Sequence, residues 1–320
     1  VSGASRVVLN GFPDEQNGLA FNADIADLGD FLPDSQGTIA ATGSLYLRSG
    51  WPALSLDARG NEIGWKDYQV SSFTASGSNQ NPVGTGNAFD VSLLDTRIGE
   101  TVLEQAHAQL LIEPESQAVS INVLSGASEL NLELAGALVQ PAESPENWGW
   151  TGHLENLQAV LNGKDRISLQ DPAPVQASSQ SARLDTACLL GSRGATICTE
   201  ADWSVGSGAE FETRIGEVSL DVLNELLGMD LRLSQMLSGD MQMLYPPAGK
   251  PSGTADFHIT AGAVNYEDDT EPILETGEGE IGFKLVNGRM TYVFLVIQIT
   301  GQGLLDFDYK FPVVTAGLDA

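Results

Sequence analysis

The sequence predicts an all-β protein, built as one long curled antiparallel or mixed β-sheet that forms an open hydrophobic trough and carries one or two short helices. Three observations lead to this fold class. Apolar and polar residues alternate with period two in many short runs. Turn-forming residues separate these runs at intervals of about 8–14 residues. Only two segments show the apolar spacing of a helix.

The alternating runs predict β-strands that are exposed on one face. They cover residues 37–48, 88–93, 118–124, 129–135, 230–234, 240–243 and 280–286. Predicted turns lie at residues 57–61, 113–116, 162–165 and 287–288. Asn287-Gly288, between two alternating runs, is the clearest signal of a two-residue hairpin. In total, the pattern indicates roughly eighteen strands.

The better helix candidate covers residues 219–228. Ser219 is suited to the N-cap and Gly228 to the C-terminal stop. Between them lies one apolar stripe, formed by Val222, Leu223, Leu226 and Leu227. We expect this helix to plug one end of the curled sheet or to cover an edge strand. A weaker candidate covers residues 26–32 and is stopped by Pro33.

The number of strands suggests what the sheet does. Strands stacked in sequence at about 4.8 Å would give a sheet roughly 80–90 Å long. A sheet of that length must twist and curl, with one face lining an apolar trough and the other in water. Acidic residues at alternate positions are predicted on the wet face; they are Asp90, Glu129, Glu133, Asp240 and Glu280. The competing interpretation is an ordinary sandwich whose interior is filled by the same apolar residues.

The apolar members of the alternating runs are the predicted lining of the trough. In the first part of the chain they are Ile39, Leu45, Leu47, Leu54, Leu56, Val91, Leu93, Val119, Ile121, Val123, Leu130, Leu132 and Leu134. In the second part they are Leu231, Leu233, Met241, Met243, Phe257, Ile259, Ile281, Phe283 and Leu285.

The two cysteines, Cys188 and Cys198, flank a loop at residues 191–194. A hairpin centred on this loop places them opposite each other, close enough for a disulfide. Two buried free thiols are the alternative, and a metal site is a weaker one because no further ligands have zinc spacing. A disulfide would indicate an oxidising compartment, such as the periplasm.

The charge limits the possible partners. The chain has 43 acidic and 15 basic residues, for a net charge of −28. This excludes nucleic acid, because phosphate binding needs clustered Lys and Arg. It also disfavours anionic membrane surfaces. The most apolar run, residues 292–300, is much shorter than the ~20 residues that cross a bilayer.

No pattern of catalytic or metal-binding residues stands out. His107, His153 and His258 lie far apart and have no partner at ligand spacing. The acidic run at residues 267–269 lacks the spacing of a calcium loop. We therefore expect no enzyme activity, no metal and no cofactor. We also expect residues 1–320 to form a single continuous segment of a larger protein.

Four motifs, in order, resemble the periplasmic part of the TamB family. The first is LGDFLPDSQG at residues 28–37, followed by Trp51-Pro52. The second is LNLELAG at residues 130–136, leading to WGWTG at residues 148–152. The hairpin that carries the cysteines is the third motif, and the segment at residues 220–227, followed by LSGDM at residues 237–241, is the fourth. Together, the motifs cover about residues 25–265.

The resemblance implies a fold and a function. TamB-like and bridge-like lipid transfer proteins form long troughs of the β-taco type, with a hydrophobic interior that carries phospholipid acyl chains. This implies a periplasmic segment of an inner-membrane-anchored protein of a Gram-negative bacterium, which supports outer-membrane assembly. The implied partner is a TamA-like outer-membrane barrel, contacted through regions outside this chain.

Two other functions remain open at this stage. A periplasmic scaffold could pair its open strand edges with unfolded outer-membrane strands by β-augmentation. An enzyme of the β-solenoid type would need carboxylates and basic residues gathered in one cleft, whereas the basic residues here are scattered. A continuous apolar lining favours the lipid function, and exposed edges over a filled interior favour the scaffold.

Overall fold

The computed structural model describes residues 5–13, 18–48, 51–79, 87–113, 115–139, 148–192, 194–221, 231–266, 272–299 and 303–310. Within them, 22 strands belong to one sheet, together with one 3-10 helix. The strand pairs are antiparallel, as between β3 (Ser35–Arg48) and β4 (Trp51–Trp65). The all-β prediction is confirmed.

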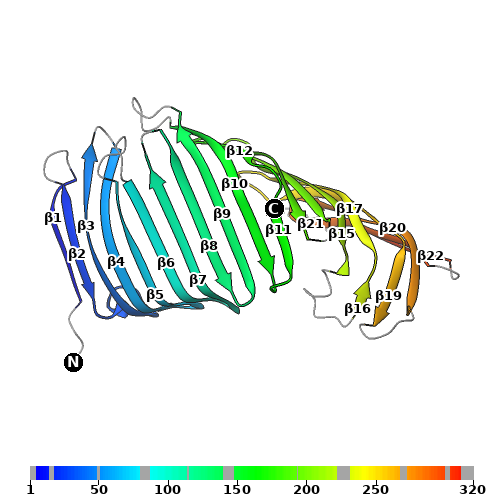
Figure 1. Cartoon of the computed structure of the whole chain (residues 1–320), viewed down its shortest axis with the longest axis horizontal. Helices are drawn as coiled ribbons and strands as arrows, with labels where there is room; N and C mark the ends of the chain where they lie inside the picture. Colours follow the sequence, from blue (N-terminus) through cyan, green and yellow to red (C-terminus); the bar gives the residue numbers. More distant parts are fainter. Residues whose placement is uncertain are drawn as a thin grey trace, which may run out of the picture. The chain divides into compact units, whose positions relative to one another are not determined.

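The chain divides into two compact units. Unit 1 comprises residues 1–168 and 174–179, and unit 2 comprises residues 169–173 and 180–320. In Figure 1 the strands of unit 1 from β3 to β9 lie side by side in chain order. Apart from β3 and β4, the elements of unit 1 are β1 (Arg6–Gly11), β2 (Leu19–Ile25), η1 (Leu28–Asp30), β5 (Tyr68–Ser78), β6 (Asn87–Ile98), β7 (Thr101–Ile112), β8 (Gln117–Ser125), β9 (Ser128–Leu138) and β10 (Gly149–Leu161).

Two short strands, β11 (Asp165–Leu169) and β12 (Ala173–Ser178), include residues of both units. The strands of unit 2 are β13 (Ser181–Gly191), β14 (Thr196–Ser204), β15 (Gly208–Ser219), β16 (Leu231–Leu233), β17 (Met236–Tyr245), β18 (Ser252–Ile259), β19 (Gly262–Tyr266), β20 (Leu274–Val286), β21 (Arg289–Ile299) and β22 (Gly303–Lys310). β20 pairs with β18 along one part of its length and with β19 along another.

The helix predictions have different outcomes. The weaker candidate contains η1, a single 3-10 turn in which the Asp27 side chain accepts a hydrogen bond from Gly29 N at 2.9 Å. The better candidate, at residues 219–228, falls mainly on residues 222–230, which lie outside the described residues.

The turn predictions are partly confirmed. Asn287 and Gly288 both have positive φ, of 51° and 70°, and connect β20 to β21 as a two-residue hairpin. The predicted turn at residues 57–61 is wrong, because those residues lie inside β4. Gly60 is needed there for another reason: a Cβ on it would come within 2.8 Å of Phe73 Cδ1.

Residues in left-handed conformation align across neighbouring strands of unit 1. Gly37 on β3, Glu62 on β4 and Asp95 on β6 have φ of 108°, 52° and 46°. The β4–β5 register skips position 62, between the pairs Asn61–Ser72 and Ile63–Val70, and the β5–β6 register skips position 95, between Val70–Thr96 and Ser72–Leu94. The β3–β4 register shifts at the same level, between Gln36 and Thr38. Because such residues interrupt the regular pleat, this line marks a bend across the strands, consistent with a curled sheet.

No sandwich core is present in the described part of the chain. The buried apolar residues are four alanines, Leu154 and Ile259, and no large side chain is fully buried. Apart from the packing of η1 on β3, the extensive contacts between elements join strands that are paired in the sheet. The interpretation as a filled sandwich is therefore wrong, since a second layer would bury large side chains between the two.

Candidate functional site

Rows of directly opposed residues cross unit 1 from β2 to β10. In an antiparallel pair, opposed residues lie on the same face of the sheet. Three such rows contain only apolar residues and glycine. The first is Phe21, Gly43, Leu56, Gly77, Phe89, Leu110, Val119, Leu134 and Leu154. The second is Ala23, Ala41, Ala58, Ala75, Val91, Ala108, Ile121, Leu132 and Leu157. The third is Ile25, Ile39, Gly60, Phe73, Leu93, Ala106, Val123, Leu130 and Ala159. We call this surface the apolar face of unit 1.

The intervening rows form the opposite, polar face of unit 1. One of them is Asn22, Thr42, Asp57, Ser76, Asp90, Gln109, Ser120, Glu133 and Asn156. On this face, His107 Nε2 lies 2.7 Å from Asp90 Oδ2. Asp90, Glu129 and Glu133, which the alternation assigns to water, all lie on this face.

The register places every predicted lining residue of unit 1 on the apolar face. Val91, Ile121 and Leu132 belong to the second row, and Ile39, Leu93, Val123 and Leu130 to the third. Leu45 and Leu54 are opposed to each other one step beyond the first row, and Leu47 follows Leu45 on the same face. The first row contains Leu56, Val119 and Leu134.

Unit 2 repeats the arrangement within its own strands. One row consists of Leu189, Ile197, Ile215, Gly239, Phe257, Ile281 and Leu295. The predicted lining residues Met241 and Phe283 share the next row of the same face through Ala255, and Met243 and Leu285 share the row after that through Gly253. Ile259 lies two residues from Phe257 and is on the same face. Leu233 is also on this face, because it is opposite Val264, and Val264 is opposite Leu274 on β20. The side chain of Leu231 lies outside the described residues.

The sequence reasoning missed several members of the apolar face. The alanines of the second row were overlooked because alanine is a weak marker of strand alternation. Phe21, Phe73 and Phe89 were also missed, although Phe89 falls within a predicted run. Each of these rings contacts the position of a glycine on an adjacent strand: Gly43, Gly60 and Gly77, respectively. An aromatic residue opposite a glycine on the adjacent strand was the signal that could have identified these members of the apolar face.

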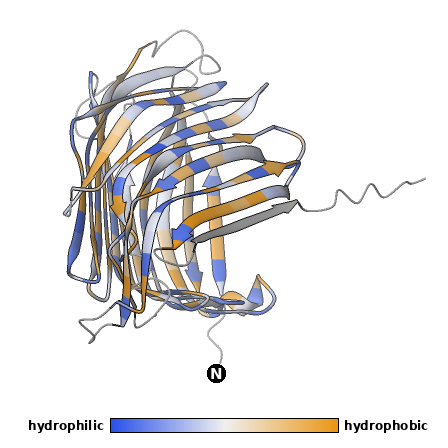
Figure 2. Cartoon of the chain, turned by 90° about the vertical axis from the view of Figure 1, so that its right-hand side faces the viewer, coloured by the Kyte–Doolittle hydropathy of each residue, from blue (hydrophilic) through white to orange (hydrophobic). Residues whose placement is uncertain are grey.

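The apolar face is accessible. Val91, Leu130 and Leu47 retain 38%, 36% and 41% of their surface, respectively. Figure 2 shows hydrophobic and hydrophilic segments alternating along individual strands, as the register requires. An exposed apolar surface of this extent, as seen among the described strands of unit 1, is unusual for a protein with no apolar ligand or partner.

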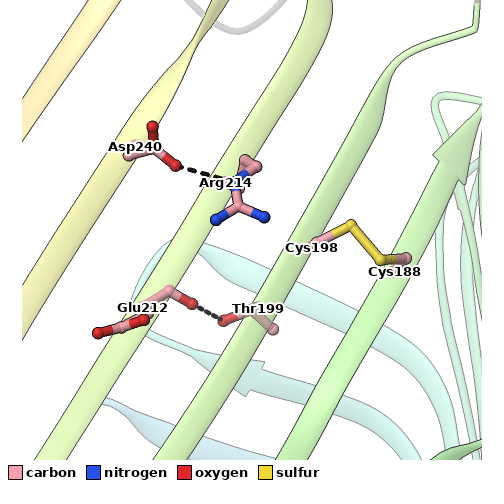
Figure 3. A network of polar contacts seen from close by, with 6 residues as sticks. All are labelled: Cys188, Cys198, Thr199, Glu212, Arg214 and Asp240. Atoms are coloured by element: carbon pink, nitrogen blue, oxygen red, sulfur yellow. Dashed lines mark hydrogen bonds and ion pairs between the residues drawn. A yellow bond between two sulfur atoms is a disulfide. The ribbon is translucent and has the colours of Figure 1, made fainter.

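The polar face of unit 2 carries the disulfide, drawn in Figure 3. Cys188 and Cys198 are directly opposed on β13 and β14, with Cα atoms 4.0 Å apart, so the predicted disulfide is present. The same row continues to Arg214, whose Nε lies 3.1 Å from Asp240 Oδ1. Nearby, Arg183 donates to Asp185 at 2.7 Å, and this hydrogen bond raises the pKa of Arg183.

Among the described residues, no group of three His, Cys, Asp or Glu side chains could hold a metal ion. His107, His153 and His258 lie on different strands, β7, β10 and β18. The arrangement offers an extended apolar surface, which is able to contact an apolar molecule.

A family model described as "TamB, N-terminal domain" matches residues 1–316. The chain belongs to the TamB family. Searches of curated proteins and of solved structures each gave no match. The TamB family is linked to outer-membrane assembly, and membership indicates a periplasmic segment of an envelope protein. Within the described residues, no helix has the length and apolarity needed to cross a membrane.

Proposed function

We propose that the apolar faces of this TamB chain shield phospholipid acyl chains as they pass between the inner and outer membranes, in support of outer-membrane assembly. The observation that carries the proposal is the set of unbroken apolar rows from β2 to β10, without a covering layer among the described residues. Each methylene removed from water on such a surface contributes about 0.8 kcal/mol.

This function needs no catalyst and no metal. Acyl chains have no polar group to recognise, so contact with continuous dry surface is sufficient to hold them. The polar face accounts for solubility, since it places carboxylates such as Asp90 and Glu133 in water. A TamA-like outer-membrane barrel is the proposed partner, contacted through parts of the protein outside this chain.

A matched pair of variants on β8 tests the proposal. Ile121 lies on the apolar face, and its neighbour Ser120 lies on the polar face. Ile121→Asp is expected to remove most co-purifying phospholipid, because a carboxylate cannot be desolvated by an acyl chain. Ser120→Asp is expected to leave the lipid content unchanged. Native mass spectrometry of the purified chain measures bound lipid, and circular dichroism verifies that both variants fold.

A photo-crosslinker provides an independent measurement. Placed at Val123 on the apolar face, it is expected to capture lipid; placed at Ser120, it is expected to capture none. The lipid function is rejected if Ile121→Asp stays folded with its lipid content intact and the Val123 crosslinker captures no lipid.

A second candidate function is β-augmentation of unfolded outer-membrane strands. It is favoured by β1, which makes its extensive contacts with β2 and whose six residues are all exposed. Val8→Pro and Asn10→Pro, tested separately, are expected to abolish peptide capture if this edge is used, because proline cannot donate a ladder hydrogen bond. If these variants affect lipid content but not peptide capture, the scaffold function is rejected.

A further inference from the structure

A fourth row of opposed residues borders the apolar face of unit 1, one step beyond the first row. It differs from the three apolar rows because it contains amide side chains. Asn87 and Gln117 are the first residues of β6 and β8, and Asn79 follows the last residue of β5. The row, which we call the amide row, is Leu19, Leu45, Leu54, Asn79, Asn87, Ile112, Gln117, Gly136 and Gly152.

The amides lie on the same side of the sheet as the apolar rows. Asn87 and Gln117 each precede a member of the first row by two residues, and Asn79 follows a member of that row by two residues. Residues two apart in a strand share a face. The backbone N–H of Asn79 donates to the carbonyl oxygen of Leu54 at 2.6 Å, which extends the β4–β5 pairing to this position.

Two amide oxygens of the row lack a hydrogen-bond donor. Asn79 Oδ1 and Gln117 Oε1 are both buried, and neither has a partner among the described residues. The orientation of the Gln117 amide is fixed, because its Nε2 donates to the carbonyl oxygen of Glu113 at 3.1 Å. A buried carbonyl oxygen without a donor costs free energy. This border of the apolar face therefore favours a ligand that brings its own donors.

A lipid with its acyl chains on the apolar face can place its polar part at this border. Ester and phosphate oxygens accept hydrogen bonds, so they cannot pair with the two amide oxygens. A primary ammonium offers three N–H donors, and its charge strengthens the bonds that it donates. The exposed residues Glu113 and Glu115, just before Gln117, also favour a cation. A choline group has the same charge but no N–H to donate.

We propose that the amide row binds phospholipid headgroups that carry a primary ammonium, with Asn79 Oδ1 and Gln117 Oε1 as the acceptors. Three strand spacings, about 14 Å, separate the two residues, so each oxygen serves a separate headgroup. The inference rests on the proposed function, because the acyl chains of the same lipids lie on the apolar face. It adds selectivity for phosphatidylethanolamine over phosphatidylcholine.

The test compares bound lipid after incubation with vesicles of equal parts phosphatidylethanolamine and phosphatidylcholine with identical acyl chains. Native mass spectrometry gives the ratio of the two in the protein, and the wild-type chain is expected to favour phosphatidylethanolamine by about fivefold. Asn79→Leu combined with Gln117→Met keeps the shape of the row and removes the acceptors. This variant is expected to bind as much lipid at a ratio near one. Asn22→Leu combined with Gln109→Met makes the same changes on the polar face and is expected to keep the wild-type ratio.

A second measurement needs no variant. The wild-type chain is incubated with phosphatidylethanolamine, its N-methyl and N,N-dimethyl derivatives, and phosphatidylcholine, each in competition with phosphatidylglycerol. These headgroups carry three, two, one and no N–H donors at equal net charge. Bound lipid is expected to fall along this series, with the largest step where the last N–H is lost.

The outcomes separate this inference from the function on which it rests. Absence of lipid from every sample, including the wild type, would overturn the proposed function and the headgroup site together. Bound lipid with no dependence on N–H donors in the wild type would overturn the headgroup site alone. A wild-type preference that persists in the Asn79→Leu/Gln117→Met variant would also overturn it. Circular dichroism verifies that both double variants fold.

Discussion

An aromatic ring beside a glycine recurs along the apolar face. A Cβ on Gly43 would lie 2.7 Å from Phe21 Cε1, and one on Gly77 would lie 2.6 Å from Phe89 Cδ1. In each case the ring occupies space that a side chain would need. The glycines therefore let large aromatic groups lie against the backbone of the next strand, which protects that backbone from water.

This contact predicts a stability effect at Gly77. Gly77→Ala is expected to lower the free energy of unfolding by about 1–3 kcal/mol, because the Phe89 ring and the adjacent backbone must shift to admit a methyl group. Urea unfolding monitored by circular dichroism measures the change. Gly206→Ala is the control, since a Cβ there meets no atom within 4 Å and its φ is not in the left-handed region. Equal effects at the two positions would contradict this account of Gly77.

Sequence reasoning is weakest at such glycines. Gly60 lies in a stretch with the composition of a turn, yet it belongs to the middle of β4. The local sequence does not distinguish a glycine in a turn from a glycine in a strand that packs against an aromatic ring. Only the facing strand, here with Phe73, distinguishes them.

The β13–β14 hairpin is the element in which the prediction of pairing was sharpest. Cys188 and Cys198 fixed the register, and the structure opposes them directly. Replacing both by serine is expected to lower the free energy of unfolding by about 2–3 kcal/mol, because the open chain regains the entropy of a short loop. Thermal unfolding of the purified chain measures the loss.

Reduction provides the control for this hairpin. A reductant should lower the unfolding midpoint of the wild-type chain and leave that of the double serine variant unchanged. If reductant lowered both midpoints equally, the effect would arise outside the disulfide.

Strand identity was predictable, but the bending of strands was not. Period-two alternation identified β8 and β9 and the faces of their residues. It gave no sign of the left-handed residues Glu62 and Asp95, which lie at positions that the strand registers skip. Neither position carries glycine, the residue that would have drawn attention to it.

For the whole molecule, two facts dominate: the described residues of the sheet bury few large apolar side chains, and the chain carries a net charge of −28. Self-repulsion opposes the folded state at low ionic strength. Raising salt from about 0.01 M to 0.15 M shortens the screening length from about 30 Å to 8 Å and is expected to raise the thermal midpoint at pH 7.

The control for the salt effect uses the sequence pI of about 4.1. Near that pH the net charge vanishes, so the same addition of salt should change the midpoint little. A midpoint at pH 7 that fell with salt over this range would show that self-repulsion is not the governing term.

At this scale, the order of motifs pointed to the family, and alternation predicted the faces of the sheet. The absence of a filled interior could not be derived in the same way, because the same alternation would suit the two layers of a sandwich. The decision required the register, which places Ile121 opposite Leu132, and the packing within unit 1, where the extensive contacts between described strands join strands that are paired in the sheet.

From β1 to β10, each strand of unit 1 bonds to those that precede and follow it in the chain. A hairpin is thus a unit that can be added or removed. Deleting or duplicating two strands leaves every remaining residue on the same face of the sheet. Descendants of such a gene can lengthen or shorten their reach in steps of about 10 Å. Evolution can thereby fit the protein to a wider or narrower gap without redesigning its surface.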